Sequence, residues 1–213
     1  MSSQAFHNDS ELHHAEISPY AERVQALELL LIEKGVLTQS EFKKMLSAAD
    51  LRSPADGARV VAHAWTDAGY KDRLLNNAKA AVTELGYEVT GEMPELIAVE
   101  NTEEEHYLIV CTLCSCYPRW LLGRPPDWYK SLSYRSRAVE DPRGVIREFG
   151  CDLNPAVKVR VVDSTADVRY IVLPRRPAGT ENLNEIELAA LVTRDSMIGV
   201  GLALEPHPIT EGS

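Results

Sequence analysis

The sequence predicts an α+β fold, in which a helical N-terminal arm and further helices precede a layered α/β domain with short strands. Two observations predict it. Apolar residues recur at helical spacing before Gly86, whereas short β-branched apolar runs begin only after it. These strands do not alternate regularly with helices, so we expect no regular βαβ winding. The expected divisions are a tail at 1–17, a helical region at 18–86, an α+β domain at 87–205 and a tail at 206–213.

Helix start signals mark the N-terminal region. Ser18-Pro19 is an N-cap followed by a proline at the first helical position, and it starts the first predicted helix. The segment Thr38–Glu41 has the capping-box pattern and starts a second helix. Ser53-Pro54 starts a third, and Tyr70–Leu85 predicts a fourth. The sequence therefore predicts four helices in this region.

Strand signals follow Gly86. The predicted strands are Leu96–Val99, Tyr107–Val110, Val157–Val162 and Tyr170–Leu173. Prolines and a glycine predict an irregular loop over Tyr117–Trp128. Short helices are predicted over Asp127–Ala138 and Asp141–Phe149, and a last helix over Glu185–Thr193.

Composition bounds the class of protein. The 213 residues are 45% hydrophobic and 25% charged, which is typical of a globular chain. A net charge of −10 argues against nucleic acid or anionic lipid as a partner, since both attract cationic surfaces. The N-terminus has no secretory signal pattern, and the aliphatic run Leu29–Ile32 is far shorter than the roughly 20 residues that span a bilayer. We expect a cytoplasmic protein with no membrane partner.

Three cysteines, Cys111, Cys114 and Cys116, directly follow a predicted strand. Their sulfurs can converge only if the backbone curls around a common centre, which indicates metal or redox chemistry in a reducing compartment. Zinc would need a fourth ligand, which would be His106, Cys151 or a more remote group. An iron–sulfur cluster would need Cys151 to join, and oxidation could link Cys111 to Cys114. The spacing favours metal binding over structural cysteines and leaves the metal open.

The segment Cys111-Thr-Leu-Cys-Ser-Cys-Tyr-Pro118 resembles the metal claw of the nitrile hydratase α subunit in its cobalt-type form. Downstream segments resemble the same family. They are Pro125–Lys130, Tyr134–Arg137, Asp141–Gly144, Glu148–Gly150, Arg169–Pro174, Arg176–Thr180 and Val192–Gly199. The resemblance covers about residues 18 to 202.

The resemblance implies a low-spin Co(III) centre, held by the sulfurs of Cys111, Cys114 and Cys116 and by the backbone amides of Ser115 and Cys116. It also implies that Cys114 is oxidised to a sulfinic acid and Cys116 to a sulfenic acid. Thr112, where iron-type members carry serine, favours cobalt over iron. The domain at 87–205 is then the metal-binding catalytic domain.

The implied reaction hydrates a small nitrile to its amide. A Lewis acid on the nitrile nitrogen makes the carbon electrophilic. Catalysis is then expected of Cys116, whose sulfenate oxygen attacks that carbon or activates a water, together with Cys114. In the family, a separate β-type subunit supplies two arginines to the claw, so this chain alone is expected to be inactive. A cobalt-inserting activator protein is the second expected partner.

Arg119-Trp120 departs from the Trp-Pro that the family commonly carries after the claw. Arg119 is either a solvent or interface arginine or a positive charge that alters substrate choice. Trp120 and Thr112 are further candidates for the substrate pocket or for contacts around the claw. The related thiocyanate hydrolase γ subunit has the same claw and can carry an arginine here, so it is one alternative. A non-enzymatic zinc-binding interaction protein is the other.

Polar residues outside the claw are predicted to be structural. For Asp163 and Asp167, beside Arg169, we favour a surface-turn network over orientation of groups around the claw. For Tyr134, Arg135 and Arg137 we favour packing at a subunit interface over anchoring of the claw loop. His63 is expected to pack rather than to bind metal.

Overall fold

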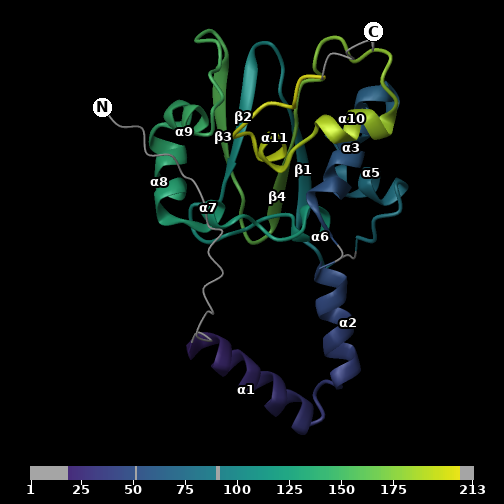
Figure 1. Cartoon of the computed structure of the whole chain (residues 1–213), viewed down its shortest axis with the longest axis vertical. Helices are drawn as coiled ribbons and strands as arrows, with labels where there is room; N and C mark the ends of the chain where they lie inside the picture. The colour runs from purple at the N-terminus through teal and green to yellow at the C-terminus, as the bar shows by residue number, and fades with distance from the viewer. Residues whose placement is uncertain (1–18, 51, 90–91, 207–213) are drawn as a thin grey trace, which may run out of the picture. The chain divides into compact units, whose positions relative to one another are not determined.

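The computed structural model describes residues 19–50, 52–89 and 92–206 (Figure 1). The predicted tail at 1–17 lies outside the described residues, as does 206–213 apart from Pro206. The chain divides into two compact units, Met1–Ser47 and Ala48–Ser213. No helix among the described residues is both long and apolar enough to cross a bilayer.

The first unit contains α1 (Pro19–Glu33), and α2 (Gln39–Asp50) begins in it. The predicted capping box at Thr38 is confirmed. The Thr38 amide donates to Glu41 Oε2 at 2.8 Å, and the Glu41 amide donates to Thr38 Oγ1 at 3.2 Å. The large apolar side chains that α1 exposes are Val24, Leu27, Leu29, Leu30 and Leu31.

The second unit begins with three helices, α3 (Pro54–Thr66), α4 (Ala68–Asn76) and α5 (Ala78–Glu84). The predicted single helix over Tyr70–Leu85 is wrong, because it is broken at Asn77. Asn77 leaves the helical region at φ −151° and ψ 83°, and its side chain accepts a hydrogen bond from the Ala80 amide at 3.1 Å. Asparagine bonds readily to nearby backbone amides, which favours a cap over a helix interior.

All four predicted strands are confirmed, and they form two parallel pairs. β1 (Glu95–Glu100) pairs with β4 (Val168–Leu173), and β2 (Glu105–Val110) pairs with β3 (Lys158–Asp163). In the second pair Val110 lies beside Asp163, so both strands end at the same level. The α+β class is therefore confirmed.

Short helices complete the unit. They are α6 (Arg119–Leu122), α7 (Asp127–Lys130), α8 (Leu132–Glu140), α9 (Pro142–Glu148), α10 (Glu185–Leu191) and α11 (Arg194–Ile198). The prediction of an irregular loop over Tyr117–Trp128 is wrong in part, because α6 forms there by burying Leu121 and Leu122. The prediction that the helix after Glu185 is the last is also wrong, because α11 follows it. Thr193 caps α11 through the Ser196 amide at 3.1 Å.

The core lies between α3, the strands and the later helices. Its fully buried members include Val60, Leu74, Leu108, Val172, Leu122 and Met197. Gly57 lets α3 approach α6 and α11, since a Cβ there would lie 2.2 Å from Leu122 Cδ2 and 2.8 Å from Met197 Sδ. This close packing holds β2, and the loop that leaves its end, on a rigid support.

Candidate metal centre

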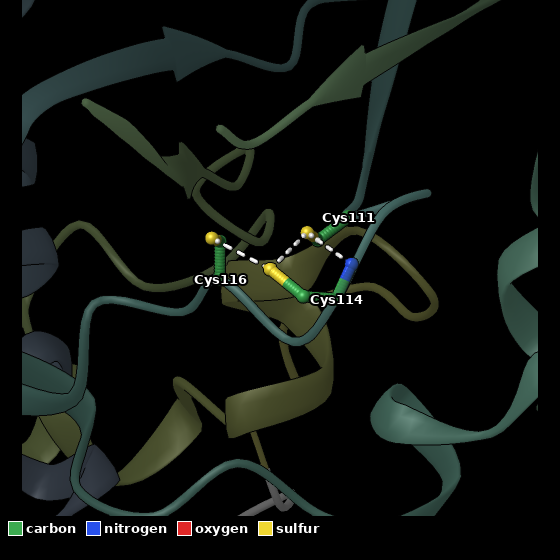
Figure 2. Close-up of side chains that lie close together, drawn as sticks. All are labelled: Cys111, Cys114 and Cys116. Atoms are coloured by element: carbon green, nitrogen blue, oxygen red, sulfur yellow. Dashed lines mark hydrogen bonds between the residues drawn. The ribbon is translucent and has the colours of Figure 1, made fainter. Parts of the chain in front are cut away.

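The three clustered cysteines converge where the chain leaves β2. The Sγ atoms of Cys111 and Cys114 lie 3.4 Å apart, those of Cys114 and Cys116 lie 3.1 Å apart, and all three fall within 4.8 Å of one another (Figure 2). Cys111 and Cys116 are buried, whereas Cys114 is exposed. The Cys114 amide donates to the Cys111 sulfur at 3.3 Å, which closes the loop on itself. The segment therefore brings three sulfurs to one centre.

Within the described part of the chain, no further His, Cys, Asp or Glu side chain joins these three sulfurs in the cluster. His106 is engaged on both sides, because Nδ1 lies 3.1 Å from Asn101 Nδ2 and Nε2 lies 2.8 Å from the Gly199 carbonyl. Cys151 is buried elsewhere in the core. A structural zinc site is closed by four protein ligands. Three soft sulfurs with peptide nitrogens between them instead fit a thiophilic transition-metal ion that keeps a position open.

The sulfurs differ in their environments. Burial raises the pKa of the Cys116 thiol to about 12, and its contacts with the sulfurs of Cys114 and Cys111 act in the same direction, while Arg169 opposes them. Hydrogen bonds from Cys116 and Cys111 lower the pKa of Cys114. Three thiolates this close repel one another, so without a cation the cluster retains protons. A bound metal cation needs the thiolate forms and would therefore displace those protons.

Asp163, at the end of β3, binds the first turn of this loop. The Thr112 amide donates to Asp163 Oδ1 at 3.0 Å, and the Thr112 hydroxyl donates to Oδ2 at 2.6 Å. The parallel register places Asp163 beside Val110, which is why its carboxylate reaches the residues just beyond β2. The expectation that Asp163 belongs only to a surface turn is therefore wrong. The signal that could have found it is its position at the end of a strand paired with β2.

Arg135 of α8 holds the same turn from the other side. Its Nε donates to the Cys111 carbonyl at 3.0 Å, and its Nη2 donates to the Thr112 carbonyl at 2.5 Å. The neighbouring Tyr134 hydroxyl donates to the Ile109 carbonyl at 2.6 Å. Arg135 thus anchors the cysteine loop, and the preferred expectation of interface packing did not anticipate this contact. Two carbonyls from consecutive residues match the fork of a guanidinium.

A cluster of packed aromatic side chains supports the Cys116 end of the loop. The Tyr129 hydroxyl, fully buried, donates to the Cys116 carbonyl at 2.9 Å. The rings of Tyr117 and Tyr129 pack edge to face with centroids 5.3 Å apart. Trp128 and Tyr134 continue the stack at 4.8 Å. The backbone of Cys116 is thereby fixed by a hydrogen bond inside a packed cluster.

Arg119 and Trp120 take different positions. Trp120 is half-buried against the core, and its indole N–H has no hydrogen-bond partner in the part of the chain that the structure describes. Arg119 is exposed and lines a cavity of about 410 Å³. The other lining residues are Ser115, Arg124, Asp127, Lys130 and the two prolines at 125 and 126. The cavity thus adjoins the cysteine loop at the residue between Cys114 and Cys116.

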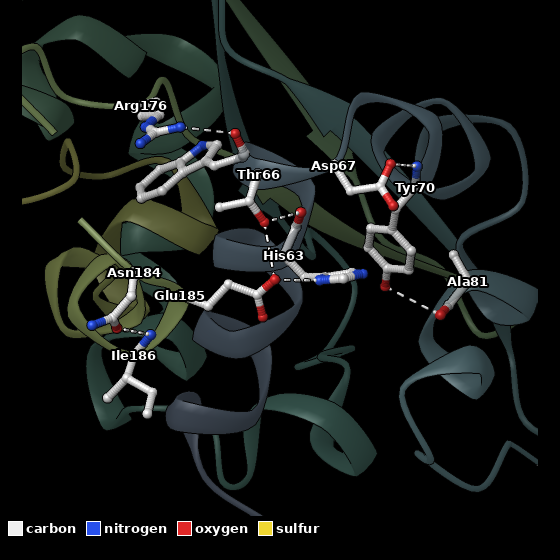
Figure 3. Close-up of polar contacts among 10 residues, drawn as sticks. His63, Thr66, Asp67, Tyr70, Ala81, Arg176, Asn184, Glu185 and Ile186 are labelled. Carbon is white, nitrogen blue, oxygen red and sulfur yellow. Dashed lines mark hydrogen bonds and ion pairs between the residues drawn. The ribbon is translucent and has the colours of Figure 1, made fainter. Parts of the chain in front are cut away.

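His63 packs as expected and does not join the cysteines. Its Nδ1 lies 2.7 Å from Glu185 Oε1, and its ring meets Tyr70 edge to face at 4.5 Å (Figure 3). The Thr66 hydroxyl donates to the same Glu185 oxygen at 3.0 Å. The contact joins α3 to the start of α10.

The fold and the loop together define a chain that presents three convergent sulfurs at the end of a parallel strand pair. The family model described as "Nitrile hydratase, alpha chain" matches residues 18–201, and the chain belongs to this family.

Individual relatives agree with this assignment. The chain is 50% identical over 188 residues to the low-molecular weight cobalt-containing nitrile hydratase subunit alpha of Rhodococcus rhodochrous, covering 87% of this chain and 90% of that protein. It is 37% identical over 197 residues to the thiocyanate hydrolase subunit gamma of Thiobacillus thioparus, covering 88% and 81%. A solved double mutant of the Fe-type nitrile hydratase from Comamonas testosteroni Ni1 superposes with a TM-score of 0.84 at 40% identity, covering 93% of this chain and all of that one.

Proposed function

We propose that this chain is the metal-binding α subunit of a cobalt nitrile hydratase, which converts a nitrile and water to an amide. The convergence of the three sulfurs is the observation that carries the proposal. The high identity to the R. rhodochrous cobalt-containing subunit supports cobalt rather than iron, in agreement with Thr112.

The proposed ligands are the sulfurs of Cys111, Cys114 and Cys116 and the backbone nitrogens of Ser115 and Cys116. When bound, the cobalt supplies Lewis acidity to the nitrile nitrogen. The chain's own contribution is to hold the ligands rigidly. Asp163 and Arg135 fix the turn at Cys111, and Tyr129 fixes the carbonyl of Cys116.

Cys116 is the proposed catalytic residue. As a sulfenate, its oxygen takes a proton from the water that attacks the nitrile carbon. In the other route the oxygen bonds to that carbon itself while the nitrile nitrogen takes up a proton, and water then displaces the sulfenate to release the amide. Burial excludes bulk water around it, which strengthens electrostatic interactions with the reacting atoms. Cys114, the exposed member, is the proposed sulfinic acid and acts with Cys116. The distance of 3.1 Å between the sulfurs of Cys114 and Cys116 supports this joint role.

A β-type subunit is the proposed obligatory partner. Five anionic ligands around a trivalent ion leave a formal charge of 3 − 5 = −2, so cations are required nearby. Arg169 lies close enough to lower the pKa of Cys116, and arginines from the partner would supply the remaining charge. The side chain of Leu113, 85% exposed at the tip of the loop, offers apolar surface for that contact. A cobalt-inserting activator and a cytoplasmic location complete the proposal, because insertion requires reduced thiols.

We propose different roles for two segments of the chain. Residues 87–205 form the metal-binding catalytic domain, and residues 18–86 form the helical region, whose first helix exposes an apolar surface.

The test is co-expression with the partner subunit in cobalt medium. We expect about one cobalt per chain, oxygen added to Cys114 and Cys116 by mass spectrometry, and hydration of a simple nitrile. Cys114→Ala should lose both metal and activity, whereas Cys151→Ala, the matched control, should retain both. Stoichiometric zinc on unmodified thiols would overturn the proposal and support the zinc-binding alternative.

Thiocyanate hydrolysis is the second candidate function. It is favoured by one observation, the exposed Arg119 beside Ser115, together with the similarity to a thiocyanate hydrolase γ subunit. Supplying acetonitrile and thiocyanate separately to the assembled complex distinguishes the two. Amide release from acetonitrile without ammonia release from thiocyanate supports the hydratase.

A further inference from the structure

The cavity lined by Arg119 lies directly beside the cysteine loop. Ser115, which stands between Cys114 and Cys116, forms part of its wall, and so does Lys130 of α7. The volume of about 410 Å³ falls in the range of small-molecule sites. A ligand whose reactive end lies at the claw can therefore place its other end in this cavity.

Arg119 is held in the cavity wall by the fold. It is the first residue of α6, and this helix buries Leu121 and Leu122, so Arg119 lies on the opposite, exposed side. The end of α6 packs closely against the backbone of Arg52. Gly123, at φ +71°, has so little room there that a Cβ would lie 2.4 Å from the Arg52 carbonyl oxygen. This contact restricts movement of the helix. The two prolines at 125 and 126, which also line the cavity, restrict the backbone that follows α6.

The charges in the cavity are unequally matched. Lys130 and Asp127 form an ion pair with each other at 2.6 Å, which cancels their charges locally. Arg124, which also lines the cavity, is engaged in an interaction of its own. The guanidinium of Arg119 has no hydrogen bond or ion pair to any residue that the structure describes. A guanidinium that faces a cavity and has no carboxylate partner can donate two parallel hydrogen bonds to a planar anion such as a carboxylate.

We propose that Arg119 binds the carboxylate of an anionic substrate, so that the site selects cyanocarboxylates, which carry a nitrile at one end and a carboxylate at the other. This inference rests on the proposed nitrile hydration and specifies its substrate class. The nitrile reacts at the claw and the carboxylate stays unchanged in the cavity. Arg119 is thus a specificity residue and does not touch the reacting atoms.

The test compares two nearly isosteric substrates, 4-cyanobutyrate and 4-cyanobutyramide, on the cobalt-loaded complex with its partner subunit. The measured quantity is the ratio of their kcat/KM values. In the wild-type complex we expect the carboxylate to be preferred, and Arg119→Gln to lower the ratio about two- to fivefold, as for a partly exposed ion pair. Arg119→Lys should keep most of the preference, and raising the salt from about 0.02 to about 0.5 M should reduce it.

Arg147→Gln is the matched control, since it removes an exposed arginine that does not line this cavity. An unchanged ratio in Arg119→Gln, or an equal loss in Arg147→Gln, overturns the inference. A weaker association with the partner subunit in Arg119→Gln, with an unchanged ratio, also overturns it and makes Arg119 an interface residue.

A binding measurement that needs no nitrile hydration tests this inference independently of the proposed function. Calorimetry with pentanoate and pentanamide measures carboxylate recognition even if no nitrile is hydrated. Tighter binding of pentanoate that requires Arg119 supports the anion site, and equal binding of the two overturns it. Ammonia release from thiocyanate that requires Arg119, without turnover of cyanocarboxylates, overturns the substrate assignment because the cavity then recognises the reacting anion itself.

Discussion

The carboxylate of Asp163 accepts two hydrogen bonds from Thr112, one from the amide at 3.0 Å and one from the hydroxyl at 2.6 Å. The two residues lie 51 positions apart in the sequence. The parallel pairing of β2 with β3 brings them together and fixes the residue that follows the first cysteine of the claw.

Removal of this carboxylate should loosen the claw. We expect Asp163→Ala to lower the free energy of unfolding by about 1.5 kcal/mol, the low end of the range for hydrogen bonds to a charged group, because the site is exposed. Cobalt occupancy of the assembled protein should fall as well. Urea denaturation and metal analysis measure the two effects. Asp167→Ala removes an exposed acid near the same strand end, whereas the contacts with Thr112 are made by Asp163. An equal loss in that control would contradict the role of Asp163.

Arg135 should not be replaceable by lysine. The guanidinium reaches the carbonyls of Cys111 and Thr112 together, whereas a lysine ammonium lacks the planar fork. We expect Arg135→Lys to lose about 1 kcal/mol of stability and part of the cobalt. Arg137→Lys is the control, because Arg137 pairs with Glu148 on the surface. Full metal content in Arg135→Lys would show that the two carbonyl contacts are dispensable.

Gly199 should not tolerate alanine. Its φ is +88°, and a Cβ would lie 1.8 Å from the Tyr107 carbonyl oxygen. The left-handed conformation and the backbone clash together predict a loss of roughly 2–5 kcal/mol on Gly199→Ala. At Gly201 an added Cβ meets its nearest atom at 3.7 Å, so Gly201→Ala should change stability by less than about 0.5 kcal/mol. Urea denaturation of both variants checks the contrast, which equal stabilities would contradict.

His106 should make the stability of the fold depend on pH. Burial lowers the pKa of His106 below its usual 6.5, although the hydrogen bond to Gly199 opposes this. The unfolded chain therefore binds a proton first as the pH falls. The stabilisation is complete above pH 6.5 and is lost as the pH falls toward the folded-state pKa, with a slope of at most about 1.4 kcal/mol per pH unit.

The measurement for His106 is the free energy of unfolding of wild type and His106→Gln at several pH values. The difference between the two should shrink below pH 6.5. His63→Gln, which removes a half-exposed histidine, serves as the control. A difference that stays constant from pH 8 to pH 5 would contradict the lowered pKa.

Local patterns in the sequence predicted much of the fold. Helix starts after Thr38 and after Ser53 follow from capping chemistry, which acts over three or four residues. The strands follow from β-branched runs. The break at Asn77 and the helix after Thr193 were missed, because each depends on whether a polar side chain caps a new helix or continues an old one, and packing decides between these outcomes.

The cysteine spacing by itself determined which atoms form the candidate centre, since three sulfurs so close along the chain need only a tight turn to meet. Tertiary structure alone decided what supports them. The parallel register brings Asp163 to Thr112, the packing of α8 brings Arg135 to Cys111, and the burial of α6 turns Arg119 toward the cavity. These contacts join residues far apart in the sequence, and they exist only once the core has fixed the strands and helices that carry them.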